Sequence, residues 1–203
     1  MRLLSSNSKF LLLASAAAVG AVLLFSINAQ SVFAHQRQLL TIGGKQYLQV
    51  VGSVNEPVYV GDKSGVDFFA YTPDPKDPLS DSANGTKKLT DLDKTVKAEL
   101  IAGPQTKTLD FNPVDGDPGH YTATFIPTLQ TTYSYALVGK INNTPVNIKY
   151  TCVPGAGDDT PGSNNTVTLA SGVIRHGIAG GFPCPLPRSD AGFPKISNAT
   201  TGQ

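Results

Sequence analysis

The chain has 203 residues, and its 16 lysine and arginine residues nearly balance its 15 aspartate and glutamate residues. A near-neutral chain exerts no long-range attraction on nucleic acid or on anionic lipid, so we expect neither as a partner of the folded domain. Glycine occurs 20 times, proline occurs 15 times and tryptophan is absent, a composition that favours short strands joined by turns.

Residues 1–34 have the pattern of a signal peptide. A short basic stretch precedes an unbroken apolar run over residues 10–25, and Val32-Phe33-Ala34 fits the specificity of signal peptidase. Cleavage there would leave a mature chain that begins at His35 and carries a net charge of −1, because the leader contains two basic and no acidic residues. The alternative is an uncleaved signal helix that anchors the protein in lipid. Either route predicts an extracytoplasmic protein that is secreted, periplasmic or on the cell surface.

Residues 35–152 are predicted to form one all-β domain. Large apolar residues recur at every second position, as in strands with one buried face, and no segment shows a helical stripe. Turn residues such as Asn142-Asn143 separate the strands and suit a tight hairpin. Seven or eight short strands without a β-α-β alternation predict an antiparallel sandwich. The clearest strands cover residues 46–54, 66–71, 95–101, 106–111, 119–126, 131–141 and 144–151.

Residues 153–203 are rich in glycine, proline, asparagine and threonine, and we expect a mostly irregular tail. Weak strand patterns occur at residues 166–170 and 173–176. The two cysteines, Cys152 and Cys184, form an even pair in an exported chain, which favours a disulfide over a metal pair or two free thiols. This bond would tie the tail to the sandwich and close a loop of about 30 residues, worth on the order of 3–4 kcal/mol.

Several motifs in residues 35–152 are similar to those of a known family. They are Val54-Asn-Glu-Pro57, Gly61, Thr95 to Leu100, Lys107-Thr-Leu109, Asp117 to Ala123, Phe125-Ile-Pro-Thr128, Tyr133 to Gly139 and Thr144-Pro-Val146. On these motifs the chain resembles exported, immunoglobulin-like β-sandwich proteins of unassigned function, which look like relatives of CopC-type and YtkA-type envelope domains. The resemblance implies an immunoglobulin-like fold, and some of these relatives are linked to copper handling.

Three histidines are the candidate metal ligands. A free N-terminal His35 would offer its amine and its ring Nδ1 as a chelating pair, and an imidazole from His120 or His176 would complete a three-nitrogen site. Nitrogen ligands suit Cu(II) best among the divalent metals, so copper is the candidate cofactor. The alternative is a frayed terminus whose histidine contacts nothing.

Other motifs give weaker indications of a metal site or an active site. Asp115-Gly-Asp-Pro-Gly119 and Asp158-Asp159 offer carboxylates to calcium but lack a terminal bidentate glutamate, and we expect the first to form a turn. No set of serine, histidine and aspartate has a recognisable catalytic spacing. Four Asn-x-Ser/Thr sequons fall in predicted turns or in the tail, at Asn84, Asn142, Asn164 and Asn198.

The leading hypothesis is therefore a non-enzymatic β-sandwich module that acts in the cell envelope as a binding or accessory subunit, with another envelope protein or a membrane protein as its partner. A copper-binding protein that uses His35 is the second hypothesis. A hydrolytic enzyme is the third.

Overall fold

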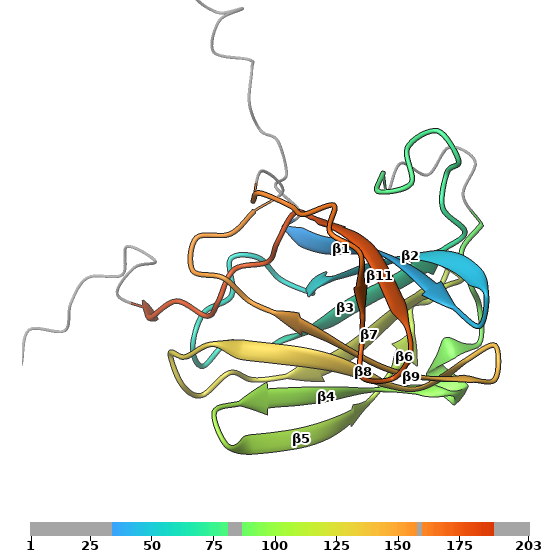
Figure 1. The fold of residues 1–203 in the computed structure, drawn as a ribbon. Helices are drawn as coiled ribbons and strands as arrows, with labels where there is room; N and C mark the ends of the chain where they lie inside the picture. Colours follow the sequence, from blue (N-terminus) through green and yellow to red (C-terminus); the bar gives the residue numbers. More distant parts are fainter. Residues whose placement is uncertain (1–33, 81–86, 158–159, 189–203) are drawn as a thin grey trace, which may run out of the picture. The chain divides into compact units, whose positions relative to one another are not determined.

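The computed structural model describes residues 34–80, 87–157 and 160–188, and these form two antiparallel sheets packed face to face (Figure 1). The larger sheet has the strand order β10-β11-β1-β2-β3-β7-β6, and the smaller has the order β5-β4-β8-β9. The predicted all-β sandwich is thus confirmed. The expected signal segment, the sequons at Asn84 and Asn198 and the Asp158-Asp159 pair lie outside the described residues.

The strands of the larger sheet are β1 (His35–Ile42), β2 (Lys45–Ser53), β3 (Ser64–Tyr71), β6 (Asn112–Pro113), β7 (His120–Phe125), β10 (Val167–Thr168) and β11 (Ile174–Ala179). Those of the smaller sheet are β4 (Val96–Ala102), β5 (Gln105–Asp110), β8 (Tyr133–Ile141) and β9 (Thr144–Thr151). A 3-10 helix, η1 (Leu92–Lys94), precedes β4. Within the described residues, no helix has both the length and the apolar character that a membrane crossing requires.

The core lies between the two sheets and is built by period-two alternation. On β9, the buried residues Val146, Ile148 and Tyr150 alternate with exposed ones. Large residues of β7 and β8 are buried in one cluster with Phe68, Val96 and Ile148; they are Tyr121, Phe125, Tyr133, Tyr135 and Leu137. Val50, by contrast, faces the opposite side of the larger sheet, where it packs with Leu48 and Tyr71.

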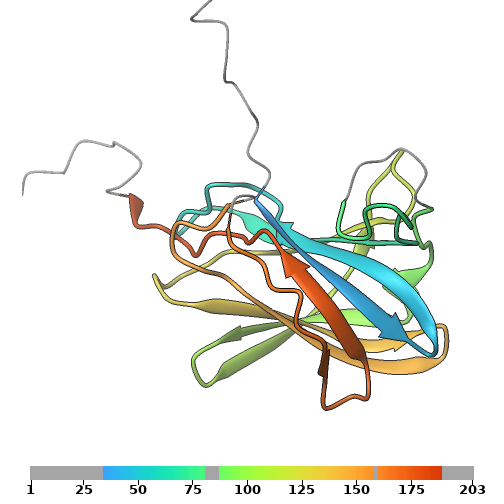
Figure 2. The ribbon, with the colours of Figure 1, turned by 45° about the horizontal axis from the view of Figure 1, so that its top comes forward.

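Strand β11 corrects the expected domain boundary at residue 152. It pairs with β1 along residues 174–179, so β1 lies between β2 and β11 (Figure 2). Phe182 is fully buried and stacks on Tyr135, with ring centroids 4.9 Å apart. Most of residues 153–188 is irregular, as expected, but this segment completes the sheet and the core and is therefore part of the domain.

The disulfide between Cys152 and Cys184 is present, with the two Cα atoms 4.9 Å apart. It confirms the predicted pairing and joins the end of β9 to the segment that follows β11. Disulfides of this kind belong to oxidising compartments outside the cytosol.

The outer face of the larger sheet carries polar as well as apolar side chains. On β3, Val66, Phe68 and Ala70 face the core, so the intervening Asp67 and Phe69 face outward. Phe69 packs against the small outer cluster formed by Leu48, Val50 and Tyr71. Asp67 is thereby fixed on a rigid central strand, beside an apolar surface.

Candidate functional site

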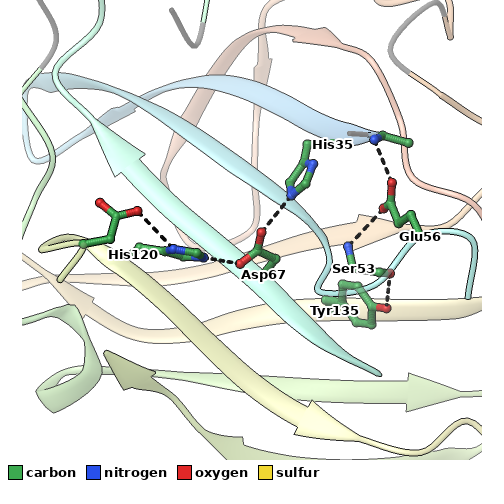
Figure 3. A network of polar contacts seen from close by, with 8 residues as sticks. His35, Ser53, Glu56, Asp67, His120 and Tyr135 are labelled. Carbon is green, nitrogen blue, oxygen red and sulfur yellow. Dashed lines mark hydrogen bonds and ion pairs between the residues drawn. The ribbon is translucent and has the colours of Figure 1, made fainter. Parts of the chain in front are cut away.

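Asp67 lies between two histidines on the outer face of the larger sheet. Its Oδ2 is 3.0 Å from Nε2 of His35, and its Oδ1 is 2.5 Å from Nε2 of His120 (Figure 3). The three side chains come from β1, β3 and β7. Residues that are far apart in the sequence therefore meet at one carboxylate, which we call the His–Asp–His cluster.

The strand register explains how His35 reaches Asp67. His35 pairs with Gly52 on β2, and Gly52 pairs with Asp67 on β3, so the three residues lie in line across the sheet. A Cβ atom at Gly52 would lie 2.6 Å from Cδ2 of His35. The imidazole ring occupies the space that a side chain at position 52 would fill.

His120 is oriented by an aromatic ring and a second carboxylate. It pairs with Phe69 across the β3–β7 ladder and stacks on the Phe69 ring, with centroids 4.1 Å apart and planes 21° apart. Its Nδ1 lies 3.1 Å from Oδ2 of Asp117. Asp117 belongs to the predicted turn before β7, and its other oxygen accepts a hydrogen bond from the Lys88 ammonium, which also lies 5.1 Å from the centre of the Phe69 ring.

These contacts limit the hydrogen bonds that the two nitrogens of the His120 ring can make. Both ring nitrogens face carboxylates, so an imidazolium can donate to Asp67 and Asp117 at once. A neutral ring can instead donate from Nδ1 to Asp117 and present the lone pair of Nε2 to a cation at Asp67. A histidine oriented by an outer carboxylate in this way is the usual arrangement around a protein-bound metal.

The cluster is shielded from solvent, and this affects its charge. The exposed fractions of the side chains are 9% for His35, 14% for Asp67 and 18% for His120. Burial raises the pKa of Asp67, but the hydrogen bonds and charges of His120 and His35 outweigh burial and bring that pKa below its usual value. The hydrogen bond from Lys88 likewise lowers the pKa of Asp117.

His176, the third candidate ligand, lies elsewhere. Its Nε2 is 2.7 Å from Oγ1 of Thr41, at the far end of β1. Thr41 is six residues along an extended strand from His35, or about 20 Å. The structure therefore brings His35 and His120 together and leaves His176 apart.

Glu56 closes the end of the β1–β2 ladder beside the cluster. Its Oε2 accepts a hydrogen bond from the backbone N–H of Ala34 at 2.6 Å, and its Oε1 accepts one from the N–H of Ser53 at 3.2 Å. The Ser53 hydroxyl in turn lies 3.0 Å from the hydroxyl of Tyr135 in the core (Figure 3). Burial raises the pKa of Tyr135, so this phenol stays protonated.

The described parts of the chain hold no group of three or more histidine, cysteine, aspartate or glutamate side chains arranged as a ready-made metal site. In the cluster, the two imidazoles contact different oxygens of Asp67. The ring atom of His35 that faces Asp67 is Nε2, whereas chelation by the chain terminus would use Nδ1.

The sequence alone did not identify Asp67 or Asp117 as members of the cluster. Asp67 had a usable signal, because it is the one acidic residue inside the apolar run Val66 to Tyr71. Asp117 was interpreted only as part of a turn. A contact between Glu56 and the start of β1 depends on a strand that the pattern did not predict.

No family model, curated protein or solved structure matches this chain. The resemblance to CopC-type and YtkA-type domains therefore stays a prediction.

Proposed function

We propose that this protein is a non-enzymatic, extracytoplasmic β-sandwich module that binds one Cu(II) ion at His35, Asp67 and His120. The observation that supports the proposal is the convergence of two histidines, which lie 85 residues apart in the sequence, on one shielded carboxylate. A protein that carries an ion between envelope partners needs such a site and no catalytic group.

The residue types of the cluster suit a copper ion, and the two imidazoles, which now contact different oxygens of Asp67, would have to turn toward one point to bind it. Two imidazole nitrogens and one carboxylate oxygen form a donor set that suits Cu(II). The Nδ1 of His120 is already engaged by Asp117, which directs Nε2 toward Asp67. Copper binding would break both hydrogen bonds to Asp67 and release to solvent any proton that the two Nε2 atoms carry. Because the only methionine is Met1, the mature chain would lack the thioether ligand that favours Cu(I).

The proposed location outside the cytosol rests on two independent features. One is the signal pattern of residues 1–34, and the other is the disulfide between Cys152 and Cys184. Together they support a secreted, periplasmic or cell-surface protein, and the signal pattern by itself supports cleavage after Ala34, so that the mature chain begins at His35.

Copper titration of the mature protein tests the proposal. Protein that begins at His35 should bind one Cu(II) per chain at neutral pH, with nitrogen ligands visible by electron paramagnetic resonance. His120→Ala and Asp67→Asn should each weaken binding at least tenfold, whereas the matched control His176→Ala should not. If His120→Ala binds copper as tightly as the unsubstituted protein, the proposal is wrong. Acidification should release the ion, since protonated imidazoles cannot bind it.

A chain with one extra residue before His35 separates two kinds of copper site. A site made of the three side chains should survive the addition, because Nε2 of His35 still faces Asp67. Loss of binding would instead assign the copper to the terminal amine and Nδ1 of His35.

A further inference from the structure

The carboxylate of Glu56 lies where the first strand of the domain begins. It bridges the backbone of Ala34, just before β1, and that of Ser53, at the end of β2. Ala34 is only 3% exposed, so the bridge is sheltered from water. The side chain thus extends the β1–β2 ladder by one step beyond its last residue pair, His35 and Gly52.

We infer that Glu56 binds the α-ammonium group of His35 in the mature protein. Removal of Ala34 takes away the amide that Glu56 now binds and leaves a charged amine one residue further on, about 3.8 Å along the chain. The Ser53 N–H holds the other carboxylate oxygen and so keeps Glu56 directed at the strand end. A charge-assisted hydrogen bond is about twice as strong as the neutral one that it replaces.

The ion pair between Glu56 and the amine would also affect the proposed copper site. This inference rests on the cleavage after Ala34 that the proposed function includes. An amine bound by Glu56 anchors the start of β1 and fixes His35 over Gly52. It also keeps the amine away from Asp67, which leaves the imidazole Nε2 as the nitrogen of His35 that faces the cluster. Glu56 is therefore a positioning residue for the copper site and is not one of its ligands.

A double-mutant cycle in copper-free buffer tests the inference. The protein is made to begin at His35, with the amine either free or acetylated, and with Glu56 either present or changed by Glu56→Gln. Acetylation should raise the unfolding equilibrium constant about tenfold when Glu56 is present and leave it nearly unchanged in Glu56→Gln, as expected for two groups in direct contact. Glu99→Gln, at the other glutamate of the chain, is the matched control and should respond to acetylation as the unsubstituted protein does.

Two outcomes would overturn the pairing. One is an acetylation effect of equal size with and without Glu56→Gln. The other concerns the unsubstituted protein and is used if Glu56→Gln does not fold. Acetylation of the unsubstituted protein should then destabilise it by an amount that shrinks with added salt. If acetylation has no effect on its stability at low salt, the ion pair between Glu56 and the amine does not exist. Because every protein in the test is released from a fusion by a protease that leaves His35 at the terminus, failure here says nothing against cleavage in the cell, which N-terminal sequencing of the exported protein tests separately.

Discussion

Gly52 lies directly opposite His35 in the β1–β2 ladder and leaves room for the imidazole ring. A Cβ atom at position 52 would approach Cδ2, Cγ and Nε2 of that ring to within 2.6 to 2.9 Å. The missing side chain is what allows His35 to cross β2 and reach Asp67.

Gly52→Ala should therefore destabilise the protein. The added methyl group must displace the His35 ring, and overpacking of this kind costs about 1–3 kcal/mol. Urea unfolding measures the loss. In a His35→Ala background the ring is absent, so Gly52→Ala should there cost little or even stabilise the strand. An equal cost in both backgrounds would show that the ring does not lie over Gly52.

Asp67→Asn should change how stability depends on pH. The pKa of Asp67 is lowered in the folded protein, so the ionised side chain contributes stability that is fully present above its unfolded pKa of about 3.9. That contribution is lost as the pH falls through the lower folded value. Denaturant midpoints between pH 5 and pH 2 should fall less steeply for Asp67→Asn than for the exposed control Asp110→Asn. Parallel curves for the two variants would mean that the histidines do not stabilise the charge.

Phe182→Ala should cost about 3–5 kcal/mol, as for a large side chain in a main core. Phe182 is fully buried against Tyr135, although it belongs to the segment expected to form a tail. Val167→Ala, at a residue that is 40% exposed in the same segment, is the control and should change stability by no more than about 0.5 kcal/mol. A loss of stability for Phe182→Ala as small as that of the control would show that residues 153–188 form a tail and are not part of the core.

Removal of the disulfide should destabilise the domain without abolishing the fold of the sheets. The bond joins residues 32 apart in the sequence, and the paired change Cys152→Ala with Cys184→Ala should cost about 3–4 kcal/mol. A reducing agent should lower the melting temperature of the unsubstituted protein and leave that of the paired variant unchanged. Equal melting temperatures with and without reductant would show that the bond contributes nothing.

The sequence predicted the strands whose alternation is regular. Strands β7, β8 and β9 lie within one or two residues of their expected bounds, because their inward positions are large and apolar. Strand β1 was not predicted, since it begins His35-Gln-Arg-Gln and buries the polar Gln38 opposite Gln49. Its partner β11 has a similarly mixed pattern, because most of its residues, including Arg175 and His176, are only partly buried.

The candidate site was predictable only in part. Histidine is rare in this chain and suits metal binding, so His35 and His120 could be selected by residue type. Which histidine meets which strand depends on the register of β1, β2 and β3, and a local pattern does not contain that information. For the same reason, the sequence alone did not separate His176 from the other two or identify Asp67.

The position of β1 between β2 and β11 also sets the order in which the sheet can be completed. As the chain is synthesised from its N-terminus, β1 can pair with β2 early, but the other edge of β1 stays unpaired until residues 174–179 have been made. Until then, the edge of β1 that faces β11 in the folded protein carries unpaired backbone groups. Pairing of β1 with β11 is thus delayed until almost the whole polypeptide is available.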